Sequence, residues 1–102
     1  MCIGDGRRRN RRTKKFRDQF DKLPESIRKL AKEAFKAFQR DQFSPALRNH
    51  ELEDSQKGRH RNGSRAVSVN FRYRAIYVVA DNVNEWYWIG SHEDYNDFIG
   101  KT

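Results

Sequence analysis

Residues 66–90, AVSVNFRYRAIYVVADNVNEWYWIG, decide the fold because short runs rich in branched and aromatic residues follow one another there. The runs are AVSVNF (66–71), YRAIYVVA (73–80) and EWYWIG (85–90). Residues 70–72 and DNVN (81–84) separate the runs and are typical of turns. The pattern predicts a three-stranded antiparallel meander, with Val67, Val69 and Phe71 on one face of its first strand.

Two amphipathic segments precede the meander. TKKFRDQFDKL (13–23) places Phe16 and Phe20 at helical spacing after a candidate N-cap, Thr13. PESIRKLAKEAFKAFQRD (24–41) begins with a proline suited to a first helical turn and carries one apolar stripe. We therefore expect an N-terminal helical hairpin that packs on the sheet, with alternate residues of 86–89 facing it.

A third helix is predicted after the last strand. Ser91 and Asp94 have the spacing of a capping box, and Gly100 is suited to the end of the helix. The predicted class is α+β: a helical hairpin on a small antiparallel sheet, followed by a short C-terminal helix. Residues 13–102 would form one domain with a small, mainly aromatic core, since only 35% of the residues are hydrophobic and 13% are aromatic.

The charge is concentrated at the N-terminus. The chain of 102 residues has a net charge of +8, and residues 1–15 carry +6 of it. We expect residues 1–12 to be a disordered basic tail with unspecific affinity for polyanions. Cys2 is the sole cysteine, which excludes a disulfide framework and fits a reducing, cytoplasmic compartment. Apolar runs are too short for a membrane helix, so no membrane partner is expected.

The connection at 43–65, FSPALRNHELEDSQKGRHRNGSR, has no regular period. Connections of this length are often functional or disordered. NHELED reads equally as a capped turn or a short strand, and His60 with its basic neighbours reads as solvated loop charge. The three histidines, at 50, 60 and 92, lack metal-ligand spacing, so neither a metal nor another cofactor is expected.

Ser91, His92 and Tyr95 lie where the last strand ends and a helix begins. Backbone N–H groups at a helix N-terminus attract anions, and a neutral histidine there can accept a proton. This reading makes the junction a candidate site. The alternative is a simple cap, Ser91, beside a surface histidine.

The order of these segments resembles the RelE/ParE superfamily of bacterial toxin–antitoxin toxins. The resemblance covers residues 13–99 and rests on five landmarks in order: LPESIRKLAKEAF, His50 and Leu52 of NHEL, SRAVSV, YRAIYVV and GSHEDY. Superfamily members commonly begin with a strand before the first helix. MCIGDGRRRNRR has almost no alternating apolar pattern, so that strand is expected to be very short or absent.

The resemblance implies roles for particular residues in metal-independent RNA cleavage. His92 would be a general acid or base, Tyr95 a phosphate hydrogen-bonder or a stacking ring, and His50 a second proton-transfer group. Arg65 and Arg74 would clamp the phosphate. Two alternatives remain open: Arg74 as a strand-surface arginine paired with Glu85, and His50 as a residue satisfied by backbone.

Three functions follow as hypotheses. In the first, the chain is a ribosome-dependent mRNA endoribonuclease that inhibits translation, with a cognate antitoxin, the ribosome and mRNA as partners. In the second, it is a ParE-like toxin without nuclease activity that acts by binding a protein such as gyrase. In the third, it is a binding module of the same fold without toxic activity.

Overall fold

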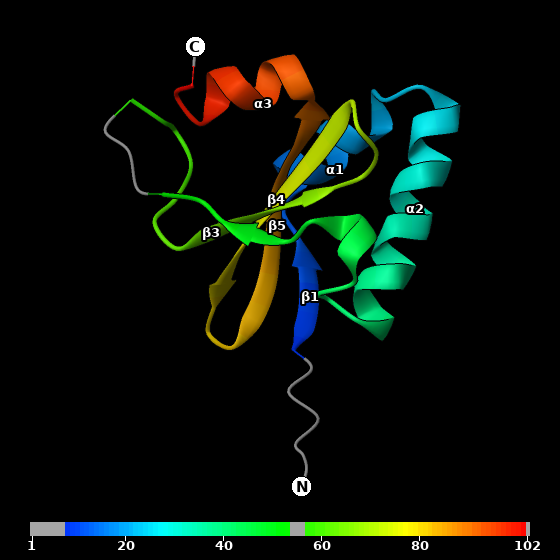
Figure 1. The fold of residues 1–102 in the computed structure, drawn as a ribbon, viewed down its shortest axis with the longest axis horizontal. Coiled ribbons are helices and arrows are strands. Elements are labelled where there is room, and N and C mark those ends of the chain that lie inside the picture. Colours follow the sequence, from blue (N-terminus) through cyan, green and yellow to red (C-terminus); the bar gives the residue numbers. More distant parts are fainter. Residues whose placement is uncertain (1–7, 54–56, 102) are drawn as a thin grey trace, which may run out of the picture.

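The computed structural model describes residues 8–53 and 57–101, and shows a mixed sheet with helices on both faces (Figure 1). The strands are β1 (Arg9–Arg12), β2 (His50–Glu51), β3 (Ser64–Ser68), β4 (Tyr73–Ala80) and β5 (Val83–Ser91). The helices are α1 (Lys14–Asp21), α2 (Glu25–Arg40), the 3₁₀ turn η1 (Pro45–Leu47) and α3 (His92–Phe98). None of the described helices is long and apolar enough to cross a membrane.

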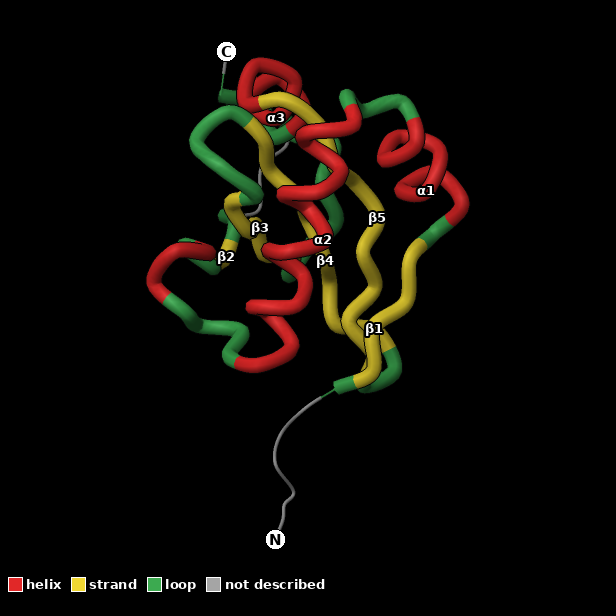
Figure 2. Tube along the Cα trace, turned by 90° about the vertical axis from the view of Figure 1, so that its right-hand side faces the viewer, coloured by secondary structure: helices red, strands yellow, loops and turns green. Residues whose placement is uncertain are grey.

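The sheet order is β1-β5-β4-β3-β2, and its centre is the predicted antiparallel meander of β3, β4 and β5. β2 adds antiparallel to β3, so NHEL forms a short strand rather than a capped turn. β1 adds parallel to the other edge, beside β5 (Figure 2). The α+β prediction is confirmed, and both edge strands are ones that the sequence had left open: β1 as a very short N-terminal strand and β2 as one interpretation of NHELED.

β1 is the very short N-terminal strand that the sequence left open, so the predicted disordered tail of residues 1–12 does not include residues 9–12. Residues 9–12 pair with residues 83–86 of β5, while residues 1–7 lie outside the described part of the chain. One side chain of β1 reaches the core: Oδ1 of Asn10 accepts hydrogen bonds from the buried Trp86 and Asn84. A strand of sequence RNRR lacks the apolar alternation that marks most strands, which is why the pattern alone left its presence open.

The predicted helix caps are present. The Thr13 side chain accepts a hydrogen bond from Phe16 N at 3.1 Å, and the Ser91 side chain accepts one from Asp94 N at 3.2 Å. Pro24 stands one position earlier than expected, as the N-cap of α2 rather than within its first turn. Gly100 has a φ of +80°, the left-handed conformation that favours glycine just beyond a helix.

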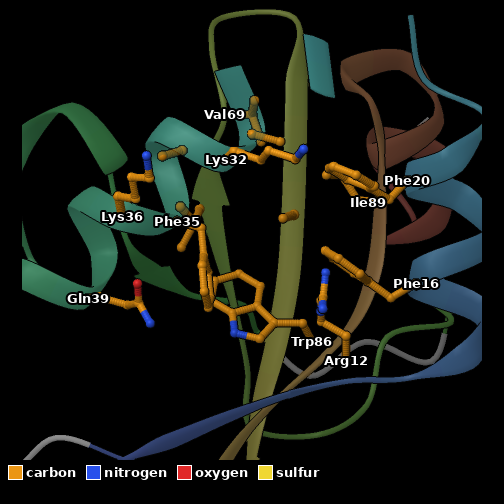
Figure 3. A pocket seen from close by; sticks show the side chains of 14 residues that line it. Arg12, Phe16, Phe20, Lys32, Phe35, Lys36, Gln39, Val69, Trp86 and Ile89 are labelled. Atoms are coloured by element: carbon orange, nitrogen blue, oxygen red, sulfur yellow. The ribbon is translucent and has the colours of Figure 1, made fainter. Parts of the chain in front are cut away.

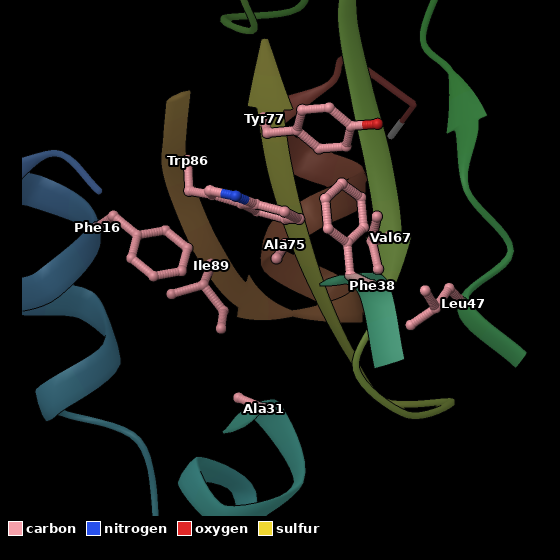
Figure 4. Packing of buried hydrophobic residues seen from close by; sticks show 9 residues of the cluster. All are labelled: Phe16, Ala31, Phe38, Leu47, Val67, Ala75, Tyr77, Trp86 and Ile89. Carbon is pink, nitrogen blue, oxygen red and sulfur yellow. The ribbon is translucent and has the colours of Figure 1, made fainter. Parts of the chain in front are cut away.

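Two apolar clusters occupy the two faces of the sheet. The first joins the sheet to α1, α2 and η1 (Figure 4), and its buried members are Phe16, Ala31, Phe38, Leu47, Val67, Ala75, Tyr77, Trp86 and Ile89. The second joins the opposite face to α3, and its buried members are Leu52, Ala66, Ile76, Trp88, Tyr95, Phe98 and Ile99. We call the first the hairpin face and the second the α3 face.

A register shift corrects the expected alternation in β5. Ile76 pairs with Trp88 but the next residue, Tyr77, pairs with Trp86, so Tyr87 is an extra residue. Such a bulge puts two consecutive side chains on one face. Trp86 therefore packs on the hairpin face and Trp88 on the α3 face, whereas strict alternation would have placed both tryptophans together.

Candidate functional site

The candidate site is centred on the buried side chain of Tyr95, in α3. The Tyr95 hydroxyl oxygen lies 3.4 Å from Nε2 of His50, which β2 brings to the same face of the sheet. Nδ1 of His50 lies 2.8 Å from the carbonyl oxygen of Arg48. A carbonyl oxygen can only accept, so Nδ1 carries the proton; in neutral His50, Nε2 is then the free acceptor and faces the Tyr95 hydroxyl.

Arg74 supplies a cation beside Tyr95. Nη1 of Arg74 donates hydrogen bonds to the carbonyl oxygens of Asn70, at 2.6 Å, and Tyr73, at 3.1 Å. Burial lowers the pKa of the Arg74 guanidinium, and the positive charge of Arg48 lowers this pKa further. The interaction with Tyr95 raises it again in part. The guanidinium stays charged at neutral pH because its ordinary pKa is so high.

Burial favours the neutral form of the Tyr95 phenol. Burial raises the pKa of Tyr95, and the charge of Arg74 offsets part of that rise. A neutral phenol can both donate and accept a hydrogen bond. The site thus combines a protonated hydroxyl, an imidazole with a free nitrogen and a fixed cation.

His92 approaches Tyr95 from the solvent side. It is the first residue of α3 and is exposed, with its ring stacked on the ring of Tyr95 at 6.3 Å between centroids and 23° between planes. Its backbone N–H donates to the carbonyl oxygen of Arg72 at 2.6 Å, which fixes the start of the helix against the β3–β4 turn. His92 therefore borders the site. It contacts the ring of Tyr95, whereas the hydroxyl of Tyr95 faces His50.

Arg65 lies on the other face of the sheet. Its Nε donates to Oδ1 of Asn49 at 2.8 Å, and its guanidinium lies 5.7 Å from the centre of the Phe43 ring. Nδ2 of Asn49 donates in turn to the hydroxyl of Tyr77, a member of the hairpin-face core. The structure therefore brings His50, Arg74, Tyr95 and His92 together and leaves Arg65 apart.

Two side chains behave differently from the sequence interpretation. His60 is buried rather than solvated, with Nε2 2.7 Å from the carbonyl oxygen of Glu53. Glu85 forms ion pairs with Arg11 and Arg61, so it is not the partner of Arg74. These two arginines hold the pKa of Glu85 below its ordinary value, the Arg61 hydrogen bond having the largest effect.

Arg48 and Asn70 are site residues that the sequence interpretation missed. Arg48 has a φ of +49°, in the left-handed region, where its carbonyl oxygen orients His50. Asn70 orients Arg74 through its carbonyl oxygen. The available signals were the position of Arg48 two residues before His50 and the turn-forming tendency of asparagine. In the described part of the chain, no cluster of three or more His, Cys, Asp or Glu residues could hold a metal ion.

A groove lies on the hairpin face, apart from the candidate site. An apolar groove of about 300 Å³ runs between α1, α2 and the sheet (Figure 3). Aromatic rings of Phe16, Phe20, Phe35 and Trp86 form much of its wall. Three cationic side chains also line it, those of Arg12, Lys32 and Lys36.

The comparisons with known proteins found solved structures of this fold. YafQ from E. coli strain BL21(DE3) has a TM-score of 0.67 and 14% identity over 87% of this chain and 98% of its own. A YoeB/ParE toxin from Agrobacterium tumefaciens has a TM-score of 0.63 and 12% identity over 82% of this chain and 98% of its own. The archaeal RelE–RelB complex from Pyrococcus horikoshii has a TM-score of 0.61 and 16% identity over 82% of this chain and 93% of its own.

The sequence comparisons gave no match: no family model matches the chain, and no curated protein does. At 12–16% identity, the likeness to the solved structures concerns the fold. It covers most of this chain and nearly all of each relative. The chain has the fold of the RelE/ParE-type toxins.

Proposed function

We propose that this protein is a RelE-type toxin, a ribosome-dependent mRNA endoribonuclease that inhibits translation in the cytoplasm. The observation that carries the proposal is the contact between the Tyr95 hydroxyl and Nε2 of His50 beside the charged Arg74. Together these groups supply what phosphodiester cleavage requires at one point: proton transfer and a fixed cation. Ribosome-bound mRNA is the proposed substrate.

In the proposed reaction, the ribose 2'-oxygen attacks the adjacent phosphorus. His50 Nε2 takes the 2'-hydroxyl proton, the O2'–P bond forms and the P–O5' bond breaks. His92, open to solvent, donates a proton to the leaving 5'-oxygen. Arg74 neutralises the phosphate, and the Tyr95 hydroxyl, which gives up its contact with Nε2 when the 2'-hydroxyl binds there, donates its hydrogen bond to the phosphate instead. The products would be a 2',3'-cyclic phosphate and a 5'-hydroxyl end.

The test is induced expression in a bacterial host, with growth and primer-extension maps of ribosome-bound mRNA as readouts. We expect His50→Gln, Arg74→Gln and Tyr95→Phe each to reduce cleavage, by about 10²- to 10⁴-fold where a proton-transfer group is removed. Arg65→Gln is the matched control, because Arg65 has the same side chain as Arg74 but lies on the opposite face. Arg65→Gln should remain toxic.

The same assay separates the other hypotheses. Arrest without RNA cuts, together with inhibition of supercoiling by the pure protein, would assign the chain to the gyrase-directed type. Normal growth with well-expressed wild type would favour a non-toxic binding module. Loss of cleavage in Arg65→Gln alone would move the phosphate contact to the hairpin face.

We further propose that a cognate antitoxin occupies the groove between α1 and α2. An amphipathic helix with acidic flanks would fit, since the groove wall is apolar and Arg12, Lys32 and Lys36 add positive charge. Charge reversal in Lys32→Glu/Lys36→Glu should weaken antitoxin binding. Lys29→Glu, at an exposed position of α2 that does not line the groove, is the matched control. Equal binding by all three proteins would contradict this placement.

A further inference from the structure

The turn between β3 and β4 holds a strongly exposed aromatic ring. Phe71 is 76% exposed, although the sequence pattern placed it with Val67 and Val69 on a strand face. β3 ends at Ser68, so Phe71 belongs to the turn. The guanidinium of Arg72 lies 5.3 Å from the centre of the Phe71 ring. The turn therefore presents a flat apolar surface with a cation beside it.

The backbone of this turn is firmly held. Oδ1 of Asn70 accepts hydrogen bonds from the backbone N–H groups of Arg72, at 2.8 Å, and Tyr73, at 2.9 Å. The Arg72 carbonyl oxygen accepts the N–H of His92, at the start of α3. The turn and α3 accordingly lie at the same end of the sheet (Figure 1). An aromatic ring on such a turn needs little ordering before it binds a ligand.

The turn is also tied to the proposed cation of the site. Nη1 of Arg74 donates to the Asn70 carbonyl oxygen at 2.6 Å, so the residue that orients Arg74 also shapes the turn. A ligand phosphate held by Arg74 would therefore lie beside the turn that carries Phe71.

We propose that Phe71 is a base-stacking platform for RNA, with Arg72 contacting the adjacent backbone phosphate. This inference rests on the proposed function and adds a contact outside the reacting groups. An exposed aromatic ring binds any base through its π face, and a neighbouring arginine adds attraction for the polyanion. Phe71 would thus position the RNA strand next to the site without choosing its sequence.

The chain contains a matched control for this surface. Phe43 is also exposed, at 61%, and the guanidinium of Arg65 lies 5.7 Å from its ring centre. This second Phe–Arg pair sits on the hairpin face, away from Tyr95 and His50. A general affinity of Phe–Arg pairs for RNA would involve both pairs equally.

The probe is a series of RNA hexamers with 2'-O-methyl groups, which remove the attacking hydroxyl, and with 2-aminopurine at one position in each. Stacking quenches 2-aminopurine fluorescence, so a titration of the full-length protein gives both affinity and the stacked position. Phe71→Ala should lose the quenching and weaken binding by about 5- to 150-fold, the range for one base–aromatic stack. Phe71→Trp should retain both, and Phe43→Ala should match the wild type.

Several results would overturn the proposal. Unchanged affinity and quenching in Phe71→Ala would do so, as would an equal loss in Phe43→Ala or a failure of the wild type to bind any hexamer. Self-association of the wild type that only Phe71→Ala abolishes, with RNA binding unchanged, would instead make Phe71 a contact between copies. Failure of the proposed nuclease activity would appear separately, in the expression assay. There, either His50→Gln would cleave mRNA as well as the wild type does, or the wild type would not cleave mRNA.

Discussion

Replacing Asn10 with alanine should weaken the attachment of β1 to the sheet and so destabilise the fold. Oδ1 of Asn10 accepts hydrogen bonds from Nε1 of Trp86, at 2.9 Å, and from Nδ2 of Asn84, at 3.2 Å. Trp86 is 4% exposed and Asn84 3%, so neither donor can turn readily to water. Oδ1 of Asn84 already has no hydrogen-bond partner among the described residues, and its whole amide would become unsatisfied in Asn10→Ala.

The expected cost follows from these two donors. Leaving a buried donor without a partner costs about 1–3 kcal/mol, and partial access of water at the edge strand reduces the total. We therefore expect Asn10→Ala to lower the free energy of unfolding by about 2–4 kcal/mol. Such a loss would be a large part of the roughly 5–15 kcal/mol that stabilises a typical domain.

Urea unfolding followed by tryptophan fluorescence measures this change. With a slope of about 1.5–2 kcal/mol per molar urea, the midpoint should fall by about 1–2.7 M. Arg9→Ala, an exposed position of the same strand, is the control and should change the free energy by less than about 0.5 kcal/mol. An equally small effect of Asn10→Ala would refute the reasoning, because it would mean that residues 9–12 contribute no more than an unattached tail.

Three further changes test the core and the site. Gly90→Ala should lower the free energy of unfolding by about 1–3 kcal/mol in the same urea assay, because a Cβ there would lie 2.8 Å from the buried Trp88 ring. Tyr77→Phe should cost about 1 kcal/mol, measured likewise, since the hydroxyl accepts a hydrogen bond from Asn49 at 2.9 Å. Above pH 10, wild-type stability should fall more steeply than that of Tyr95→Phe: the Tyr95 pKa is raised by burial, so the unfolded chain releases its proton first. Equal slopes in pH-dependent thermal unfolding would contradict this.

The helices and the central meander were predictable because their signals are local. Apolar side chains recur at helical spacing along α2. Thr13 and Ser91 are N-caps that each accept a hydrogen bond from a backbone N–H three residues later. The order of elements then restricts the ways in which they can pack. The α+β class followed from these local signals alone.

Features that depend on distant partners were left open by the sequence or were missed. β1 is stabilised by pairing with residues 83–86, more than 70 positions away, and its own sequence is charged. The bulge at Tyr87 is a second example, because nothing in EWYWIG marks an extra residue. His60 is a third: it is buried and its Nε2 lies 2.7 Å from the carbonyl oxygen of Glu53, a contact that no local pattern marks.

The separation of the two proposed phosphate clamps could have been derived from the sequence. Val67 and Val69 were expected on one face of the first meander strand, and Arg65 has the same parity as both. Arg65 pairs with Tyr77, so both side chains lie on the hairpin face. Arg74 lies three positions from Tyr77 on the same strand, so its side chain lies on the α3 face. Alternation along paired strands therefore places Arg65 and Arg74 on opposite faces of the sheet, and of the two only Arg74 shares a face with His50 and Tyr95, where the proposed phosphate would bind.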